Sequence, residues 1–200
     1  NGMHTLYRSL ICYNQYSGRL ALCKARPTNK TILMHLFLTG FIGVGKTTIG
    51  KQLSDLLDFT FIDLDAHIEQ KEKKSISSIF LEDGEAYFRT SERECIEDLL
   101  GLRGNYVIAL GGGSLQNSDI AKQICTSGVC IYLYKPWADL AIRLSELTNR
   151  PLLEQKSIVE LELLFQSRAP LYEQSQLKVP INSTFTLKKL IQTLRLSTNR

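Results

Sequence analysis

A loop with the composition of a phosphate-binding site begins at Gly40, in the stretch GFIGVGKTT. It fits the pattern G-x-x-x-x-G-K-[ST], with an apolar run before it and a helical pattern after it. Glycines let the backbone turn tightly and aim N–H groups at an anion, lysine adds a positive charge, and a threonine hydroxyl can bind magnesium. We therefore expect a nucleoside triphosphate here, the alternative being a glycine-rich turn that binds nothing. The residues expected to contact it are Gly43, Val44, Gly45, Lys46, Thr47 and Thr48.

Two aspartates, Asp63 and Asp65, end a second apolar run, FTFIDLD at residues 59–65. On an extended strand, side chains two residues apart point the same way. Two carboxylates beside a phosphate loop repel each other unless a cation or a proton-bearing substrate lies between them. This suits one carboxylate for a magnesium shell and one for a substrate hydroxyl. The alternative is that an aspartate caps the following helix, a position where this residue is favoured.

A third apolar run, YVIAL at residues 106–110, ends in three glycines, Gly111 to Gly113. Three glycines allow a ligand to approach the backbone closely, with N–H groups as donors. A flexible turn is the alternative, and the place of the glycines after a strand favours the ligand.

Three arginines stand in short distinctive stretches: Arg89 in GEAYFR, Arg150 in NRPLL and Arg168 in RAPLY. A single arginine is usually solvated or paired at the surface. Their residue type alone therefore assigns them no role.

Apolar runs and amphipathic segments alternate from Met34 onward and predict the elements that position these residues. Strands are expected at 35–39, 59–65, 106–110, 129–134 and 177–181. Helices are expected at 46–57, 66–82 with Ser75 as an N-cap, 85–100, 136–147, 158–174 and 185–195. This alternation predicts an α/β fold with parallel strands joined by right-handed crossovers and ligands bound at the carboxyl ends of the strands.

The charge of the chain is unevenly distributed. Residues 1–33 hold five of the 24 Lys and Arg residues and no acid, which leaves 19 basic against 20 acidic residues in the rest. The body of the chain therefore has no global charge that favours nucleic acid. We interpret residues 1–33 as a basic extension, either transit-like or an upstream, non-native segment with Met34 as the start, and expect the domain to span residues 34–200.

Apolar runs and cysteines exclude further classes. No run of 18 or more apolar residues exists, so we expect no membrane span. Five cysteines form no C-x-x-C pair and no spaced cluster with histidine, so a zinc site is not expected. Cys125 and Cys130 are interpreted as small buried side chains. We expect a cytoplasmic monomer, with plastid-like targeting by the first 33 residues as the alternative.

Six stretches resemble those of shikimate kinases and stand in the order of that family: GFIGVGKTT, FIDLD, DGEAYFR, VIALGGG, RPLL and RAPLY. The resemblance covers residues 34–200. It implies a three-layer α/β/α sandwich with a five-stranded parallel sheet, a P-loop NTPase of the nucleoside monophosphate kinase type with a mobile lid at about 148–157. It also implies transfer of the γ-phosphoryl group from ATP, as co-substrate, to the 3-hydroxyl of shikimate. Mg²⁺ would be the cofactor, and the product would enter the pathway to chorismate and aromatic amino acids.

The resemblance assigns roles on the nucleotide side of the site. Lys46 and Thr47 would hold phosphates and magnesium, and Asp63 would join the magnesium shell through water. Asp65 would hydrogen-bond the attacking hydroxyl, either as a base or as an orienting group.

The resemblance also assigns roles on the acceptor side and in the lid. Arg89 and Arg168 would clamp the shikimate carboxylate, and the backbone of Gly111–Gly113 would approach shikimate and the γ-phosphate. Arg150 would reach from the lid to the transferring phosphate. Arg143 would lie against adenine.

Two other functions stay open from the sequence. A related small-molecule kinase, such as a gluconate kinase, would share the phosphate loop, but the glycine triplet and the arginine pair favour a carboxylate-bearing ring. A catalytically silent relative that binds a nucleotide or a partner would be expected to lack the lysine, an aspartate or a clamp arginine. None of these is missing here.

Overall fold

The computed structural model describes residues 11–14, 19–22, 34–146 and 156–196. Its strands are β1 (Ile11–Asn14), β2 (Arg19–Leu22), β3 (His35–Thr39), β4 (Thr60–Asp63), β5 (Tyr106–Ala109), β6 (Val129–Tyr134) and β7 (Leu177–Pro180). Its helices are α1 (Lys46–Leu57), α2 (Leu64–Glu72), α3 (Ile76–Glu82), α4 (Gly84–Leu100), the short 3₁₀ helix η1 (Ser114–Gln116), α5 (Ser118–Ser127), α6 (Trp137–Glu146), α8 (Ile158–Tyr172) and α9 (Leu187–Leu196).

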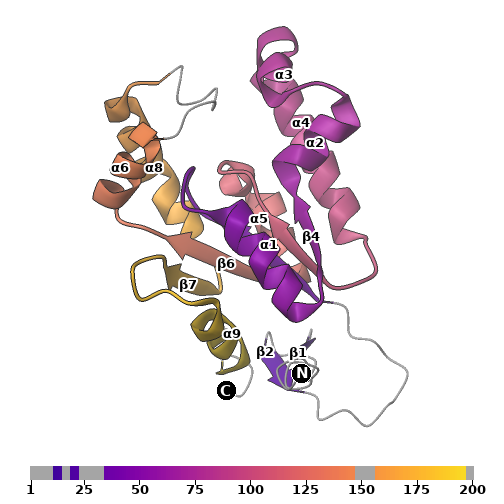
Figure 1. The fold of residues 1–200 in the computed structure, drawn as a ribbon. Helices are drawn as coiled ribbons and strands as arrows, with labels where there is room; N and C mark the ends of the chain where they lie inside the picture. The colour runs from indigo at the N-terminus through magenta and orange to yellow at the C-terminus, as the bar shows by residue number, and fades with distance from the viewer. Residues whose placement is uncertain (1–10, 15–18, 23–33, 147–155, 197–200) are drawn as a thin grey trace.

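Five parallel strands form the central sheet in the order β4-β5-β3-β6-β7, with β3 in the middle (Figure 1). The connection from β3 to β4 runs toward one edge, whereas the next three connections run toward the other. Because parallel crossovers are right-handed, helices then cover both faces of the sheet. Helix α1 lies on one face beside α9, and α4 and α5 lie on the other. The predicted three-layer sandwich with a five-stranded parallel sheet is confirmed.

The middle strand β3 is buried over its whole length, as expected when helices cover both faces of a parallel sheet. Leu36, Phe37 and Leu38 are among the most deeply buried apolar side chains. The core therefore holds β3 rigidly and delivers its carboxyl end to Gly40, where the phosphate loop begins.

The prediction of an extended strand over residues 59–65 is wrong at its end. Strand β4 stops at Asp63 and helix α2 begins at Leu64, so Asp65 lies in the first helical turn. The Asp63 carboxylate caps this helix, and a cap competes with continued strand geometry because it satisfies free N–H groups.

The predicted helix over 66–82 is interrupted after α2. Lys73 adopts a left-handed conformation, with φ of 54°, and ends α2. Ser75 then caps α3 by accepting a hydrogen bond from the Ser78 N–H at 3.1 Å, as the sequence predicted.

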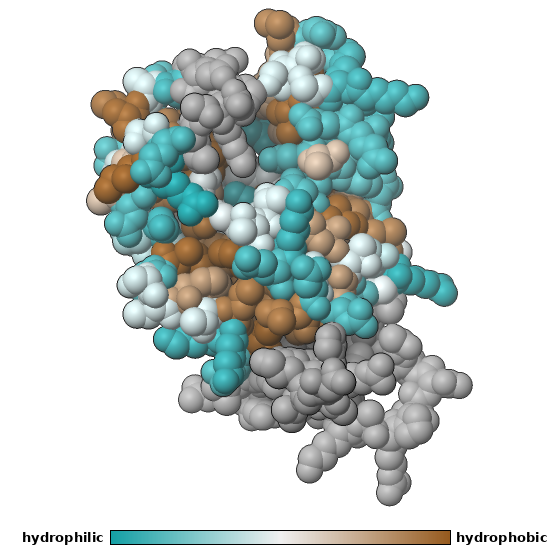
Figure 2. Space-filling view, viewed as in Figure 1, coloured by the Kyte–Doolittle hydropathy of each residue, from teal (hydrophilic) through white to brown (hydrophobic). Residues whose placement is uncertain are grey.

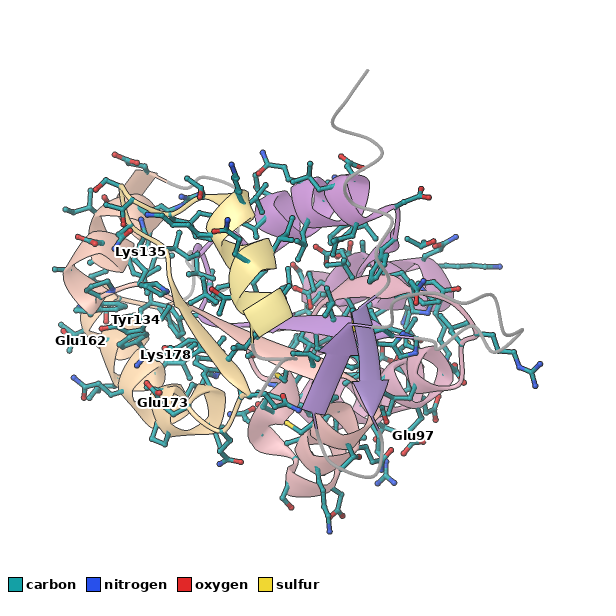
Figure 3. The ribbon with its side chains drawn as sticks, turned by 90° about the horizontal axis from the view of Figure 1, so that it is seen from below. Glu97, Tyr134, Lys135, Glu162, Glu173 and Lys178 are labelled. Carbon is teal, nitrogen blue, oxygen red and sulfur yellow. The ribbon has the colours of Figure 1, made fainter. Side chains whose placement is uncertain are left out.

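The end of α8 is fastened to the outer edge of the sheet (Figure 3). Lys178 on β7 forms an ion pair with Glu173, the residue that follows α8, and its ammonium lies 4.3 Å from the ring centre of Tyr134 on β6. These contacts fix the carboxyl-terminal end of α8, where Arg168 and Tyr172 lie one turn apart, against the sheet.

Residues 1–33 contain an antiparallel pair of strands, β1 and β2, which no sequence pattern had predicted. Strand β2 lies against α9. Most of the predicted lid, including Arg150, lies outside the described residues. Within the described part of the chain, no helix has the length and apolar content needed to cross a membrane.

Candidate active site

The phosphate loop joins β3 to α1 and has the geometry that its glycines predicted. Gly40 has φ of 142°, and a side-chain Cβ there would lie 2.5 Å from the Leu133 carbonyl oxygen on β6. Gly45 has φ of 103° and precedes α1 without a side-chain cap, so the first N–H groups of the helix are available to an anion. Lys46 Nζ donates to the carbonyl oxygens of Gly40 at 2.8 Å and Phe41 at 3.2 Å, so its ammonium spans the loop.

Thr47 and Asp63 come together from α1 and β4. Thr47 Oγ1 donates to Asp63 Oδ2 at 2.6 Å. The other oxygen of the same carboxylate accepts from the backbone N–H groups of Asp65 at 3.2 Å and Ala66 at 3.5 Å. Asp63 is thus both the helix cap and the partner of the threonine hydroxyl. A hydroxyl and a carboxylate beside a phosphate loop are the hard oxygen donors that Mg²⁺ prefers, so these residues fit that ion.

The glycine triplet lies against three of the predicted acceptor residues, one glycine to each. A Cβ at Gly111 would be 3.0 Å from Asp65 Oδ1, and one at Gly113 would be 2.8 Å from Arg89 Nη1. At Gly112 it would be 3.4 Å from Arg168 Nη1. The glycines therefore make room for functional side chains, which explains their small size better than a flexible turn does.

Arg89, on α4, is surrounded by carboxylates. Its Nη1 donates to Glu92 Oε2 at 2.7 Å and its Nη2 to Glu85 Oε1 at 3.1 Å. Burial on its own would lower the pKa of Arg89, but the charge and hydrogen bond of Glu92, followed by those of Glu85, outweigh burial and raise it. Its positive charge is thus already balanced within α4.

Glu92 is a site residue that the sequence reasoning missed. It is 4% exposed, and its second carboxylate oxygen accepts from Ser114 Oγ at 2.7 Å. It therefore connects Arg89 on α4 to the η1 turn that follows the glycines. The spacing Arg-x-x-Glu within a predicted helix was the available signal, because residues three apart are neighbours on a helix surface.

Arg168, on α8, has very different surroundings. It is 6% exposed, and its Nε has no hydrogen-bond partner among the described residues. No ion pair involving Arg168 is found in the part of the chain that the structure describes. The neutral Tyr172 hydroxyl hydrogen-bonds Arg168. A buried guanidinium that no described carboxylate balances is costly and is suited to receive an anion.

Three aromatic rings join the phosphate loop to α6 and α8. Phe41 packs edge-on against Trp137 at 6.2 Å and against Phe165 at 5.3 Å between ring centres. Trp137 and Phe165 also contact each other at 5.6 Å. The loop is thereby packed against the two helices that flank the predicted lid.

The outer surface differs between the two sides of the molecule (Figure 2). Hydrophilic side chains dominate the region of α2, α3 and α4, whereas hydrophobic side chains gather over α6 and α8. Exposed apolar residues on these two helices include Ile142, Val159 and Leu163.

A cavity of about 420 Å³ lies between α4, η1 and α5, and Arg89 and Gly113 line it.

Two predicted site residues are not brought to this cluster by any described contact. Arg143 is exposed on α6, and no described hydrogen bond or ion pair joins it to the phosphate loop. Its adenine contact stays a prediction. So does the role of Arg150, which lies outside the described residues.

The fold and the site define a class. The carboxyl end of the parallel sheet carries a P-loop, a helix N-terminus, a threonine–aspartate pair and a glycine triplet flanked by two arginines. These features are typical of a P-loop phosphotransferase with a nucleoside monophosphate kinase-like fold. The sequence model described as shikimate kinase matches residues 42–195. The chain belongs to the shikimate kinase family.

Curated relatives agree with this family. A shikimate kinase of Chlorobium phaeobacteroides is 42% identical, with 72% of this chain and 76% of the relative aligned. A shikimate kinase of Bacillus cereus is 36% identical, with 80% of this chain and 95% of the relative aligned. The similarity therefore spans nearly the whole of some relatives.

Solved structures agree as well. The shikimate kinase from Acinetobacter baumannii in complex with shikimate superposes with a TM-score of 0.72 at 33% identity, covering 81% of this chain and 90% of that one. A gluconokinase from Sinorhizobium meliloti has a TM-score of 0.51 at 16% identity, with 84% of this chain and 92% of that chain covered. At that identity the gluconokinase shares the fold alone.

Proposed function

We propose that this chain transfers the γ-phosphoryl group of ATP to the 3-hydroxyl of shikimate, giving shikimate 3-phosphate and ADP. The observation that carries the proposal is the buried Arg168 guanidinium, whose Nε lacks a partner among the described residues. It faces a glycine triplet that also adjoins Arg89 and Asp65. A small acceptor with one carboxylate and several hydroxyls would supply an anion for Arg168 and a hydroxyl for Asp65. Membership of the shikimate kinase family supports the same acceptor.

Substrate binding relies on the two arginines. Guanidinium groups bind carboxylates bidentately, which fixes the direction of the ring as well as its position. Arg168 provides a charge that no described carboxylate balances, and Arg89 provides donors that Glu92 holds in one orientation. Together they would turn the reacting hydroxyl toward Asp65.

Asp65 is the residue proposed to meet that hydroxyl. Its carboxylate oxygen lies beside Gly111, at the end of the neighbouring strand β5. From there it would accept a hydrogen bond from the hydroxyl and orient the oxygen for attack. In a loose transition state the proton leaves late, so orientation is its main contribution.

The nucleotide phosphates are proposed to bind the loop residues Gly43–Thr48 and the N-terminus of α1. Lys46 would exchange its bonds to loop carbonyls for phosphate oxygens. Thr47 and Asp63 would hold Mg²⁺, which supplies charge neutralisation between the phosphates when bound. The protein's contribution is alignment of donor and acceptor, since phosphoryl transfer needs little covalent assistance.

We also propose that the domain works as a cytoplasmic monomer that binds neither nucleic acid nor membrane. All site residues discussed come from one chain, and the charge beyond residue 33 is nearly balanced, with 19 basic against 20 acidic residues. The role of residues 1–33 as an extension outside the catalytic domain is part of the same proposal.

The decisive experiment measures ADP release from Mg-ATP with shikimate, with gluconate and without an acceptor. We expect release with shikimate alone, together with a product that carries phosphate on the 3-hydroxyl by NMR. Equal or greater release with gluconate would overturn the choice of acceptor. Release with neither acceptor, in a protein that still binds ATP, would overturn the proposed activity.

A further inference from the structure

Tyr172, the last residue of RAPLY and of α8, has a role that the proposed chemistry does not use. Its side chain is 1% exposed, and its ring packs against Tyr132 at 5.2 Å between ring centres. Its Oη donates to the carbonyl oxygen of Gly112 at 2.5 Å. Burial raises the pKa of Tyr172 to about 12, although the charge and hydrogen bond of Arg168 oppose the rise. The hydroxyl therefore keeps its proton at neutral pH and stays a donor.

The three carbonyl groups of the glycine triplet are bonded in two different ways. The Gly111 oxygen accepts from Ser114 N at 3.3 Å and Oγ at 3.1 Å, and the Gly113 oxygen accepts from Gln116 N at 3.0 Å. These three bonds are local to the turn. Among the described residues, the bond from Tyr172 to Gly112 is the hydrogen bond that joins this turn to α8.

This bond fixes more than one atom. Because a peptide unit is planar, holding the Gly112 carbonyl also fixes the direction of the Gly113 N–H, which points the opposite way. Arg168 stands four residues before Tyr172, so both side chains leave the same face of α8. A Cβ at Gly112 would be 3.4 Å from Arg168 Nη1 and 3.7 Å from Tyr172 Oη. The glycine is thus held between the arginine and the tyrosine.

We propose that Tyr172 is a positioning residue for the acceptor site: its hydroxyl sets the distance between the glycine loop and Arg168 and the direction of the Gly113 N–H. The statement about substrate rests on the proposed function, whereas the statement about the loop does not. A tyrosine that only filled the core would need its ring but not its hydroxyl. The hydroxyl can therefore be tested separately from the ring.

The test compares Tyr172→Phe with Tyr132→Phe, a matched control at a buried tyrosine whose ring contacts Tyr172. For Tyr172→Phe we expect the shikimate KM to rise about tenfold. The buried Gly112 carbonyl loses its hydrogen-bond donor, and the distance between the glycine loop and Arg168 is no longer fixed. The ATP KM and kcat should change less than about twofold. Tyr132→Phe should leave all three within about twofold.

A second measurement needs no substrate. Hydrogen exchange of the backbone in residues 111–116 should be faster in Tyr172→Phe than in the wild type or Tyr132→Phe, while exchange in the core strand β3 stays the same. Unchanged exchange in 111–116, or equal increases of the shikimate KM and the ATP KM, would overturn the positioning role. If the wild type did not phosphorylate shikimate, the proposed function would fail, and the exchange comparison would still decide the role of Tyr172 in the loop.

Discussion

The two sides of the proposed acceptor site each bring one arginine to the glycine triplet, but the surroundings of the two arginines are opposite. On α4, Arg89 is paired with Glu92 and Glu85. On α8, Arg168 is buried with no carboxylate partner among the described residues, beside a tyrosine that holds the loop. Among the described residues, carboxylates balance the arginine on α4, whereas none balances the arginine on α8, which leaves Arg168 suited to an anionic ligand. In a two-arginine clamp, one arginine can thus set the orientation of the ligand, as proposed for Arg89, while the other provides most of the binding affinity, as proposed for Arg168.

The most severe test of this comparison is Arg168→Met, which keeps the aliphatic stem and removes the charge. We expect the shikimate KM to rise about a hundredfold, because a desolvated charge-assisted pair is lost. The unfolding temperature should stay the same or rise, since an uncompensated buried charge disappears. Steady-state kinetics and calorimetry measure both quantities. A lower unfolding temperature would mean that Arg168 has an anionic partner within the protein and would break the comparison.

The same substitution on the other side, Arg89→Met, should give a different combination. The shikimate KM should rise about tenfold, because carboxylates already offset part of this charge. The free energy of unfolding should fall by about 1–3 kcal/mol, because buried Glu92 loses its cationic partner. Urea denaturation checks the fall. Equal stability of the two methionine variants would contradict the division of roles.

Glu92→Gln tests orientation with a smaller change. The amide oxygen can still accept from Ser114, but the ion pair with Arg89 is lost. We expect the shikimate KM to rise about threefold to fivefold and the ATP KM to stay constant. The control is Glu97→Gln, which removes the exposed pair between Glu97 and Arg93 on the same helix. An effect of equal size in both variants would assign the change to helix α4 as a whole.

A small drop in pH should have the smallest effect of these tests, and it should lower local stability on the α4 side before the α8 side. Hydrogen bonds from Ser91 and Tyr87 lower the pKa of Glu72 below its ordinary value of 4.5. A carboxyl whose folded pKa is lowered stabilises the fold above the unfolded pKa, and this stability is lost as the pH falls through the folded pKa. Below about pH 4.5, protection from hydrogen exchange, relative to the intrinsic rate at each pH, should therefore fall where α2 meets α4 before it falls at Tyr172. Glu72→Gln should remove this difference, and an equal loss of protection in both regions would argue against it.

The phosphate loop and the sheet could be predicted from the sequence because their signals are local. Gly40 and Gly45 require positive φ, and β3 reads as one continuous apolar run. The end of β4 could not be predicted in the same way. The Asp63 carboxylate caps helix α2 and also accepts a hydrogen bond from Thr47 on helix α1. The local sequence presents capping and a role in the site as alternatives, so it could not predict that one residue has both.

The acceptor side was predicted in part. The spacing of Asp63 and Asp65 indicated a carboxylate for a substrate hydroxyl, and the resemblance chose Asp65 and added Arg89 and Arg168. The structure brings these last three to the glycine triplet. Glu92 and Tyr172 were not predicted. The pairing of Glu92 with Arg89 had a local signal, but the partners that join Glu92 and Tyr172 to the glycine turn, Ser114 and Gly112, lie 22 and 60 residues away along the chain. Contacts of this kind depend on which strands lie side by side in the sheet. The residues around one position in the sequence do not show this.

Because Trp137 contacts Phe41, the fluorescence of Trp137 can report on changes in the phosphate loop. The sequence contains one tryptophan, so every change in indole emission comes from a single place. That place touches the first turn of the phosphate loop and the helix that leads into the predicted lid. Nucleotide titrations can therefore be followed in the unlabelled enzyme, with the loop itself altering the surroundings of the fluorophore.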